Sequence, residues 1–171
     1  VVEAEFSALL PDGVGMLVTR LTGEADDARS RFYEYIDNLD ASLCAYGKAK
    51  IDAFGFSFTA TAYLEDVNQD ERLAAISEKV DYPIISSSQA IGRALERLGV
   101  ERLALFSPYP DWLTELSEAY WTRKGYEVVS VATMPDDTSD TVNIYGLTVD
   151  GMLAASRALE TDRADAIVVT G

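Results

Sequence analysis

The sequence predicts an α/β fold of two pseudo-symmetric lobes, in which helices flank parallel sheets and an active-site cleft lies between the lobes. Strand patterns alternate with helix patterns along most of the 171 residues, and this alternation is typical of parallel sheets. The segment 50–58 is also echoed by the segment 163–171. In both segments a charged helix end leads into Asp-Ala, a short apolar run and a hydroxyl residue, which is Ser57 or Thr170. Each run is too short for a helix and predicts a buried parallel strand.

The first half of the chain has clear helix and strand boundaries. An apolar face at helical spacing ends at the turn Pro11-Asp12-Gly13, and either Asp26 or Asp27 can cap the next helix. That second helix carries a long apolar stripe and ends near Gly47. The other segments follow from their hydrophobic periodicity. Together, these features predict helices at 1–10, 28–47 and 65–79 and strands at 14–21, 51–57 and 82–85.

In the second half, polar residues at strand ends lead into helices. The run Ser86-Ser87-Ser88-Gln89 starts a helix that ends at Gly99, and Ser107-Pro108-Tyr109-Pro110-Asp111 leads into the next one. Gly125 suits the left-handed position that often follows a helix. These features predict helices at 90–99, 112–124 and 149–161 and strands at 102–106, 126–132 and 165–170.

The two halves correspond element by element, and this correspondence defines the expected domains. Helix 1–10 with strand 14–21 corresponds to helix 112–124 with strand 126–132, and helix 28–47 with strand 51–57 corresponds to helix 149–161 with strand 165–170. The second copy has a leading strand at 102–106, whose counterpart would precede Val1. We therefore expect a first lobe at 1–88 that lacks its leading strand and a second lobe at 89–171 that lacks its C-terminal return segment.

The composition excludes several classes of function. With 29 acidic and 14 basic residues, the formal net charge is −15, and nucleic acid and anionic membranes are unsuitable partners because both bind basic surfaces. An acidic surface of this kind also suggests a high-salt environment. The sequence contains no histidine and one cysteine, which excludes Ser-His-Asp and Cys-His chemistry and a zinc site of His and Cys ligands.

The cysteine content and the apolar runs predict a cytoplasmic protein. Cys44 cannot form an internal disulfide, and its helical surroundings predict a small core residue, which is typical of a reducing compartment. The longest apolar runs fall short of the roughly 20 residues that span a bilayer. The first residues of the chain also lack the pattern of a signal peptide.

Hydroxyl side chains follow four of the predicted strands. They are Ser57 with Thr59 and Thr61, Ser86 with Ser87 and Ser88, Ser107 with Tyr109, and Thr170. Ligands of open α/β sheets bind beyond the carboxyl ends of the strands, where hydroxyls and helix N–H groups can bind an anion without a cation. A carboxylate suits such a site, although Ser and Thr also cap helices for purely structural reasons. Tyr109 lies between two prolines, which suits either a ligand-binding phenol or a packing tyrosine.

Several motifs resemble a known enzyme superfamily. They are Thr59-Ala60 after a buried strand, Tyr82-Pro83 before Ser86-Ser87-Ser88-Gln89-Ala90, Leu98-Gly99-Val100 before a strand, Ser107-Pro108-Tyr109, and Asp165-Ala166-Ile167-Val168-Val169-Thr170. These motifs span nearly the whole chain and resemble the aspartate/glutamate racemase superfamily, in particular the branch of maleate cis-trans isomerase and arylmalonate decarboxylase. The resemblance implies two α/β lobes with an active site in the cleft and chemistry on small carboxylic acids without a cofactor.

The resemblance also implies the site residues, position by position. In these enzymes one or two cysteines at paired strand ends move protons or act as the nucleophile. Phe58 occupies the first cysteine position and Gly171 the second, so both cysteines are absent from this sequence. Tyr109 matches the tyrosine that binds the substrate carboxylate and is the remaining candidate for a catalytic role. The substrate-binding positions are Thr59, Ala60, Ser88 and Tyr109.

These observations lead to one expected function and two alternatives. The expected function is a cofactor-independent isomerase, racemase or decarboxylase that acts on a small mono- or dicarboxylic acid between the lobes. Because both cysteine positions lack a thiol, a catalytically silent protein that binds a carboxylate is the first alternative. A purely structural α/β module is the second. The sequence leaves the oligomeric state open, including a homo-oligomer.

Overall fold

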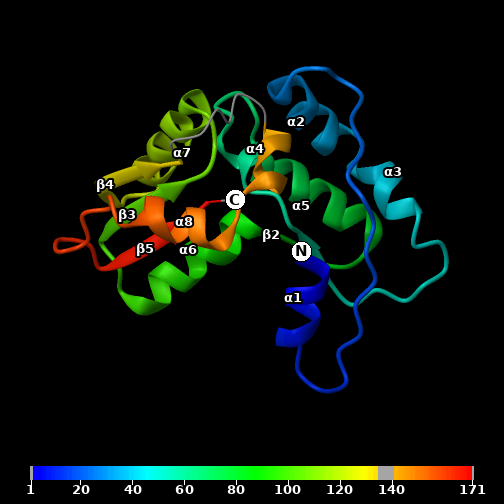
Figure 1. Ribbon diagram of the computed structural model, residues 1–171. Coiled ribbons are helices and arrows are strands. Elements are labelled where there is room, and N and C mark those ends of the chain that lie inside the picture. Colours follow the sequence, from blue (N-terminus) through cyan, green and yellow to red (C-terminus); the bar gives the residue numbers. More distant parts are fainter. Residues whose placement is uncertain (1, 135–140, 171) are drawn as a thin grey trace.

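The structure is a computed structural model that describes residues 2–134 and 141–170, and two parallel sheets organise it (Figure 1). In the smaller sheet, β1 (Phe54–Phe56) pairs with β2 (Ile84–Ser86). In the larger sheet, β3 (Arg102–Ser107) lies between β4 (Glu127–Thr133) and β5 (Ala166–Val169). All of these pairings are parallel, so the predicted α/β fold with helix-flanked parallel sheets is confirmed.

Helices connect the strands in both sheets. The first part of the chain contains α1 (Val2–Leu9), α2 (Ala28–Asp37), α3 (Leu39–Cys44), α4 (Ala60–Tyr63) and α5 (Gln69–Val80). The second part contains α6 (Ser87–Leu98), α7 (Asp111–Arg123), the 3-10 helix η1 (Thr141–Gly146) and α8 (Val149–Ser156). No helix in the described ranges is long and apolar enough to cross a membrane.

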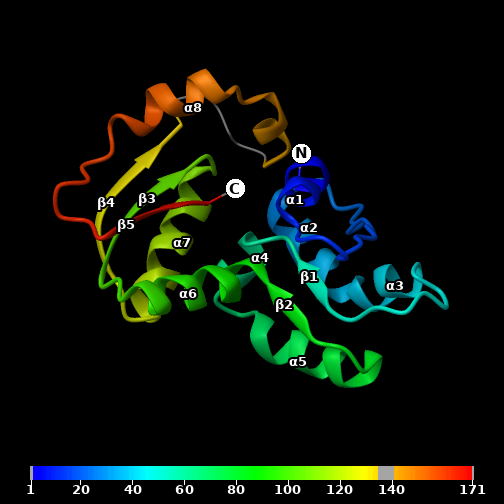
Figure 2. The same ribbon diagram turned by 90° about the horizontal axis from the view of Figure 1, so that it is seen from below.

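The central strand β3 is buried on both faces, as its continuous apolar sequence predicts. Leu103 and Leu105 pack in the core cluster that contains the buried side of α7. Ala104 and Phe106 alternate with them and pack in the cluster that includes residues of α8. Figure 2 shows α7 and α8 on opposite sides of this sheet. The hydroxyl-bearing segment after β3 therefore leaves the sheet at a position fixed by packing on both faces.

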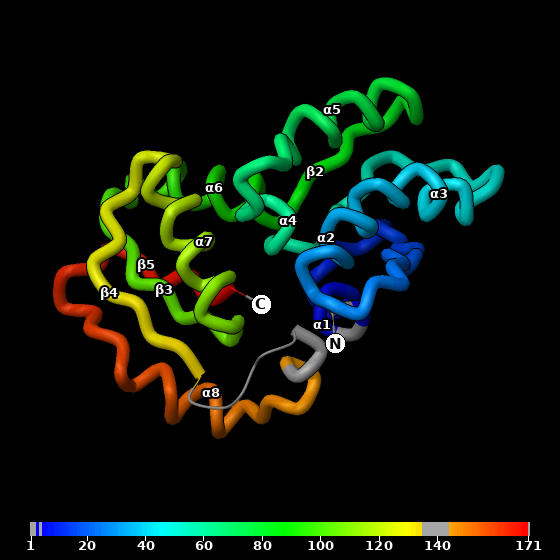
Figure 3. The backbone as a smooth tube through the Cα atoms, turned by 90° about the horizontal axis from the view of Figure 1, so that it is seen from above, coloured from blue at the N-terminus to red at the C-terminus, as the bar shows by residue number. Residues whose placement is uncertain are grey.

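The short helix α4 joins the two sheets. It contacts α7 on one side and α2 and α5 on the other, and Figure 3 shows it between these parts of the chain. Tyr63, its last residue, shares a core cluster with Phe32 of α2 and Trp121 of α7. The sequence predicts no helix or strand at residues 60–63, because four residues are too few to show a helical period. The segment directly after β1 is thus held against α7, which covers one face of the larger sheet.

The strand predicted at 14–21 is wrong. Its backbone bonds to the side chains of residues 38–46 rather than to a strand: the Ser42 hydroxyl donates to the carbonyl of Arg20 at 3.2 Å, and the Tyr46 hydroxyl donates to that of Leu17 at 3.3 Å. In the described part of the chain no strand pairs with this segment. Leu17 is 58% exposed, so its apolar pattern does not reflect a buried face.

The helix predicted at 28–47 is divided at Asn38. Its buried stripe is confirmed, since Phe32, Ile36, Leu39 and Leu43 are all buried. However, the Asn38 side chain donates from Nδ2 to the carbonyl of Thr22 at 3.0 Å, and α3 starts at the next residue with a new axis. Asparagine side chains often compete in this way with helical backbone bonding. The helix predicted at 149–161 is also shorter than expected, because α8 ends at Ser156.

Cys44 is exposed, which contradicts the prediction of a small core residue. It is the last residue of α3, and the buried residues of that helix are Leu39, Ser42 and Leu43. Cys44 directly follows Leu43 in the helix and is turned away from the face that these residues form. Cys44 consequently lies on the outer face.

Candidate active site

Thr59 and Tyr109 meet where the two sheets face each other. Thr59 follows β1 and immediately precedes α4, and Tyr109 lies between β3 and α7. The Thr59 Oγ1 and the Tyr109 hydroxyl lie 3.0 Å apart, and both residues are buried. The carboxyl ends of β1 and β3 are therefore connected by one hydrogen bond between residues that are far apart in sequence. This is the edge at which ligands of open α/β sheets bind.

The loop that carries Tyr109 is fixed by hydrogen bonds to its neighbours. The Tyr109 N–H donates to Ser107 Oγ at 3.3 Å, and the Thr114 hydroxyl donates to the Tyr109 carbonyl at 3.2 Å. The Ser107 and Thr114 hydroxyls are themselves 2.7 Å apart. Pro110 then begins α7 by accepting backbone hydrogen bonds from Leu113 and Thr114. The phenol is thus held by contacts at both ends of a short loop.

The pair carries no charge at neutral pH. Burial raises the pKa of Tyr109, an effect that the hydrogen bond with Thr59 partly offsets. A neutral phenol and a neutral hydroxyl can each donate to a ligand oxygen. The first turn of a helix also has backbone N–H groups that the helix does not use, and in α4 these belong to Ala60 and the next residue. The arrangement can therefore bind an anion through neutral donors.

Phe58, at the first cysteine position of the resemblance, belongs to an aromatic cluster of Phe32, Tyr35 and Phe58. Its ring centroid lies 5.1 Å from that of Phe32 and 5.3 Å from that of Tyr35, and both contacts are edge-to-face. Such contacts stabilise packing. A phenylalanine has no proton to transfer, so the residue directly before Thr59 contributes packing and no acid or base.

The second cysteine position, Gly171, lies outside the described residues. The residue before it, Thr170, is fully buried and donates from its backbone N–H to the carbonyl of Phe106 at 3.0 Å. The end of β5 is thereby attached to the end of β3. The structure brings Thr170 to the same edge of the larger sheet as Ser107.

Ser88 lies in a buried network separate from the Thr59–Tyr109 pair. Its hydroxyl accepts a hydrogen bond from Gln69 Nε2 at 3.2 Å and lies 3.0 Å from the Ser86 hydroxyl. Gln69 in turn accepts a hydrogen bond from Thr61. These contacts join the starts of α5 and α6 to α4. The contact of Ser88 with a substrate stays a prediction.

The sequence did not indicate the roles of Thr114, which fixes the Tyr109 loop, and of Gln69, which belongs to the Ser88 network. Thr114 lies in the first turn of α7, where a threonine is common, so its bond to the Tyr109 loop had no distinctive signal. Gln69 starts α5 and is only 3% exposed. A glutamine at the polar start of a helix is usually exposed. Its burial depends on the position of α6, which the local sequence does not reveal.

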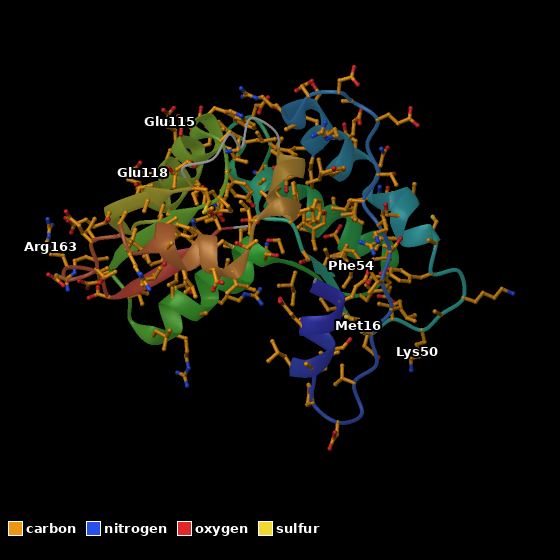
Figure 4. The ribbon with its side chains drawn as sticks, in the orientation of Figure 1. Met16, Lys50, Phe54, Glu115, Glu118 and Arg163 are labelled. Carbon is orange, nitrogen blue, oxygen red and sulfur yellow. The ribbon has the colours of Figure 1, made fainter. Side chains whose placement is uncertain are left out.

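Charged side chains on α7 and around α5 lie away from the Thr59–Tyr109 pair. Figure 4 shows Glu115 and Glu118 pointing away from the body of the protein on the outer side of α7, and both residues are exposed. A surface hollow between α2, α3 and α5 is lined by the ion pairs of Arg72 with Asp37 and of Lys79 with Asp40. These carboxylates belong to the acidic surface that the composition predicts. No group of His, Cys, Asp and Glu in the described ranges could hold a metal ion.

Comparisons with solved structures show the fold. The maleate cis-trans isomerase of Nocardia farcinica, bound to TRIS, matches with a TM-score of 0.83 and 20% identity over 98% of this chain and 71% of that chain. A maleate isomerase from Pseudomonas putida S16 matches with a TM-score of 0.70 and 22% identity over 81% of this chain and 57% of that one. An arylmalonate decarboxylase matches with a TM-score of 0.65 and 16% identity over 81% and 61% of the two chains.

Sequence comparisons establish the family. No curated protein sequence matches the chain. The family model of arylmalonate decarboxylase, however, matches residues 31–171, which include both members of the Thr59–Tyr109 pair. This match and the structural neighbours confirm the branch of the aspartate/glutamate racemase superfamily that the motifs predict. The chain belongs to the arylmalonate decarboxylase family.

Proposed function

We propose that the protein is a cofactor-independent isomerase, racemase or decarboxylase that binds a small mono- or dicarboxylic acid at the Thr59–Tyr109 pair. The observation that carries this proposal is the 3.0 Å contact between the two hydroxyls, at the edge where the carboxyl ends of β1 and β3 meet. Buried neutral donors suit a carboxylate, because they replace its water without placing a permanent charge in the core.

The same donors can stabilise an intermediate. When a carbon atom next to a carboxylate loses a proton or carbon dioxide, the electron pair moves into an enediolate, whose oxygens accept stronger hydrogen bonds than the substrate does. Tyr109 and Thr59 share one hydrogen bond, so the hydroxyl that donates outward from the pair is placed to reach one such oxygen. Their contribution then grows as charge develops, which is the condition for catalysis.

The three reactions differ in the number of proton-transfer groups they need. Racemisation needs an acid or base on each face of the carbon atom, and isomerisation of maleate through an adduct needs a nucleophile. Decarboxylation of a malonate breaks one C–C bond and needs one proton at the carbon atom that carbon dioxide leaves, and in this proposal water supplies that proton. Phe58 cannot transfer a proton, so the face it occupies is inert. Decarboxylation is accordingly the reaction that the residues around Thr59 support best.

A turnover experiment tests this proposal. The full chain is incubated separately with phenylmalonate, maleate and aspartate, and products are followed by proton NMR in deuterated buffer, which also reports proton exchange. We expect turnover of at least one acid and a loss of roughly 10- to 100-fold in carboxylate affinity in Tyr109→Phe, the range for a hydrogen bond to a charged group. Tyr126→Phe is the matched control, because the Tyr126 hydroxyl donates to the Gly92 carbonyl and lies outside the site.

A catalytically silent carboxylate-binding protein is the second candidate, and the packing of Phe58 against Phe32 and Tyr35 favours it. A thiol is replaced at this position by a ring that is part of the core. Calorimetry with the same three acids separates the candidates. Binding without turnover supports the silent protein, turnover supports the enzyme, and the absence of both contradicts a carboxylate site altogether.

We also propose that the two sheets belong to two lobes, at 1–88 and 89–171, in a cytoplasmic protein. The smaller sheet lies within the first range and the larger sheet within the second. The helix α6 starts at Ser87 and leads from one sheet to the other. Limited proteolysis would test this division, since cleavage within 87–98 should separate two fragments more readily than cleavage inside either sheet.

A further inference from the structure

Three buried polar atoms lie behind the Thr59–Tyr109 pair without a hydrogen-bond partner in the described structure. They are the Tyr63 hydroxyl, the Ser117 hydroxyl and the Trp121 indole N–H. All three residues are at most 1% exposed. Burying an unpaired polar atom opposes folding, so such atoms are rare in native proteins. Three of them in one place call for a physical explanation.

The three atoms share one location, because α4 packs against α7. Tyr63 ends α4, whereas Ser117 and Trp121 are four residues apart on the buried face of α7. Thr59 is the N-cap of α4, one helical turn before Tyr63, and the hydrogen-bonding groups of Thr59, Ser117 and Trp121 all act on the pKa of Tyr63. Burial raises the pKa of Tyr63, so its phenol keeps its proton. The cluster is therefore continuous with the hydroxyl of the Thr59–Tyr109 pair.

The chemistry of these groups gives the cluster a direction. An indole N–H can only donate a hydrogen bond, whereas a hydroxyl can accept one and has a single proton to donate. If the Trp121 N–H donates to the first hydroxyl of the cluster, that hydroxyl must direct its own proton to the next oxygen. Each further hydroxyl that accepts a hydrogen bond does the same. The outermost hydroxyl of the series, that of Thr59 or Tyr109, then points its O–H bond away from the cluster. A ligand at that point meets a donor.

We propose that Trp121, Ser117 and Tyr63 are positioning residues that orient the outward hydroxyl proton of the Thr59–Tyr109 pair toward a bound carboxylate. The proposal rests on the function proposed above and deepens it, because it explains why neutral hydroxyls would select an anion. Hydrogen bonds of functional sites are often long in a ligand-free protein and tighten on binding. The unpartnered atoms are then explained by interactions that are long in the ligand-free chain and shorten when the ligand binds.

The first test needs no ligand. Tyr63→Phe, Thr59→Val and the double variant are unfolded with urea, and the shifts of the midpoint are compared. Residues of one hydrogen-bonded chain give non-additive shifts, whereas independent residues give additive ones. Tyr120→Phe is the matched control, because its ring centroid lies 5.2 Å from that of Tyr63 but its hydroxyl belongs to no part of the chain proposed here. We expect coupling of Thr59 with Tyr63 and none with Tyr120.

The second test measures selection for an anion. Calorimetry compares maleate with its neutral diamide in the full chain and in each variant. We expect Tyr63→Phe to raise the Kd for maleate roughly tenfold, as loss of an oriented hydrogen bond does, and to lower the preference for the acid over the amide. Tyr120→Phe should change neither. Ser117→Ala, a smaller change in the same chain, should act in the same direction and gives the answer if Tyr63→Phe does not fold.

The outcomes separate this proposal from the one on which it rests. Suppose that Tyr63→Phe and Ser117→Ala both raise the unfolding midpoint, show no coupling with Thr59→Val and leave the Kd for maleate unchanged. The three atoms are then simply unpaired and the proposal is overturned, while carboxylate binding stands. If the wild-type chain binds none of the acids, the proposed function fails and the positioning role fails with it. Coupling together with a weaker and less acid-selective affinity confirms the positioning role.

Discussion

The two ends of the larger sheet differ in charge and in burial. At the amino ends of β3 and β5, Arg102 Nη2 lies 2.7 Å from Asp165 Oδ1, and Asp165 Oδ2 accepts the backbone N–H of Arg102 at 2.9 Å. Both side chains are partly exposed. At the carboxyl ends, Ser107, Tyr109 and Thr170 are buried and neutral. The amino ends of the strands therefore carry an ion pair, and the carboxyl ends carry buried hydroxyl groups.

This difference separates stability from ligand binding. The Arg102 guanidinium and nearby N–H groups lower the pKa of Asp165 to about 2, so this carboxylate is ionised at neutral pH and bound to donors of the protein. The hydroxyls at the other end can still donate to a ligand, and no fixed carboxylate competes for them within the contacts described for Tyr109 and Thr59. The charged end holds the strands, and the neutral end remains able to bind an anion.

A cavity in the centre of the sheet should have the largest effect, because it affects both ends. Leu105 lies in the middle of β3, is fully buried and pairs with Val131 and Val168. Leu105→Ala should lower the free energy of unfolding by about 2–5 kcal/mol, measured by urea denaturation. Ile167→Ala is the control, since Ile167 is on the neighbouring strand but 54% exposed. Equal losses in the two variants would contradict the buried position of Leu105.

Removing one member of the hydroxyl pair should have the next largest effect. Thr59→Val leaves the buried Tyr109 hydroxyl without its 3.0 Å partner, which should cost about 1–3 kcal/mol of unfolding free energy. Thr59→Val combined with Tyr109→Phe removes both polar groups and should cost less than the single change. Urea denaturation of the three variants decides this. A double variant less stable than Thr59→Val would mean that the two hydroxyls are stabilised by other contacts.

The larger sheet was predictable from sequence because its signals are local. Each of its strands is a short apolar run between clear boundaries, and β3, β4 and β5 all fall within predicted strands to about one residue at either end. The positions of Thr59 and Tyr109 followed from the same rule, since both come directly after strands. Their contact does not follow from this rule, because β1 and β3 belong to different sheets and the packing of α4 against α7 brings the two residues together.

Other features depend on neighbours that a local pattern does not reveal. The segment 14–21 has a strand composition, but a strand exists only where another strand pairs with it, and here Ser42 and Tyr46 take that role. The packing of the partly buried Phe58 depends on Phe32 and Tyr35 of α2. The exposure of Cys44 depends on which face of α3 packs inward. Tyr63 was visible in the sequence, but its buried, unpartnered hydroxyl depends on the packing of α4 against α7.

Salt should have a smaller effect on stability, and it should act on the charged surface and not on the neutral Thr59–Tyr109 pair. Because the formal net charge is −15, repulsion between acidic side chains should destabilise the protein at low ionic strength. We expect the melting temperature to rise by several degrees between dilute buffer and 1 M KCl, measured by calorimetry. The cost of Thr59→Val should stay constant, since the pair is uncharged. A melting temperature indifferent to molar salt would contradict the high-salt hypothesis.

The smallest effect is expected from the ion pair, and its pH dependence has a definite sign. The pKa of Asp165 is lowered from 3.8 to about 2 in the folded protein, so its contribution to stability is present above pH 4 and is lost as the pH falls from about 4 to 2. Arg102→Met removes the largest cause of this shift, while the N–H groups of Glu101 and residue 102 still donate to the carboxylate. The acid limb of the stability curve, measured by urea denaturation at pH 2–6, should therefore become shallower but not vanish. Arg163→Met removes a comparable exposed pair with Glu127 and leaves Asp165 untouched, so its acid limb should match the wild type. If Arg102→Met and wild type gave the same limb, the backbone N–H groups alone would hold the amino end, and the charge difference between the two ends would have no role in stability.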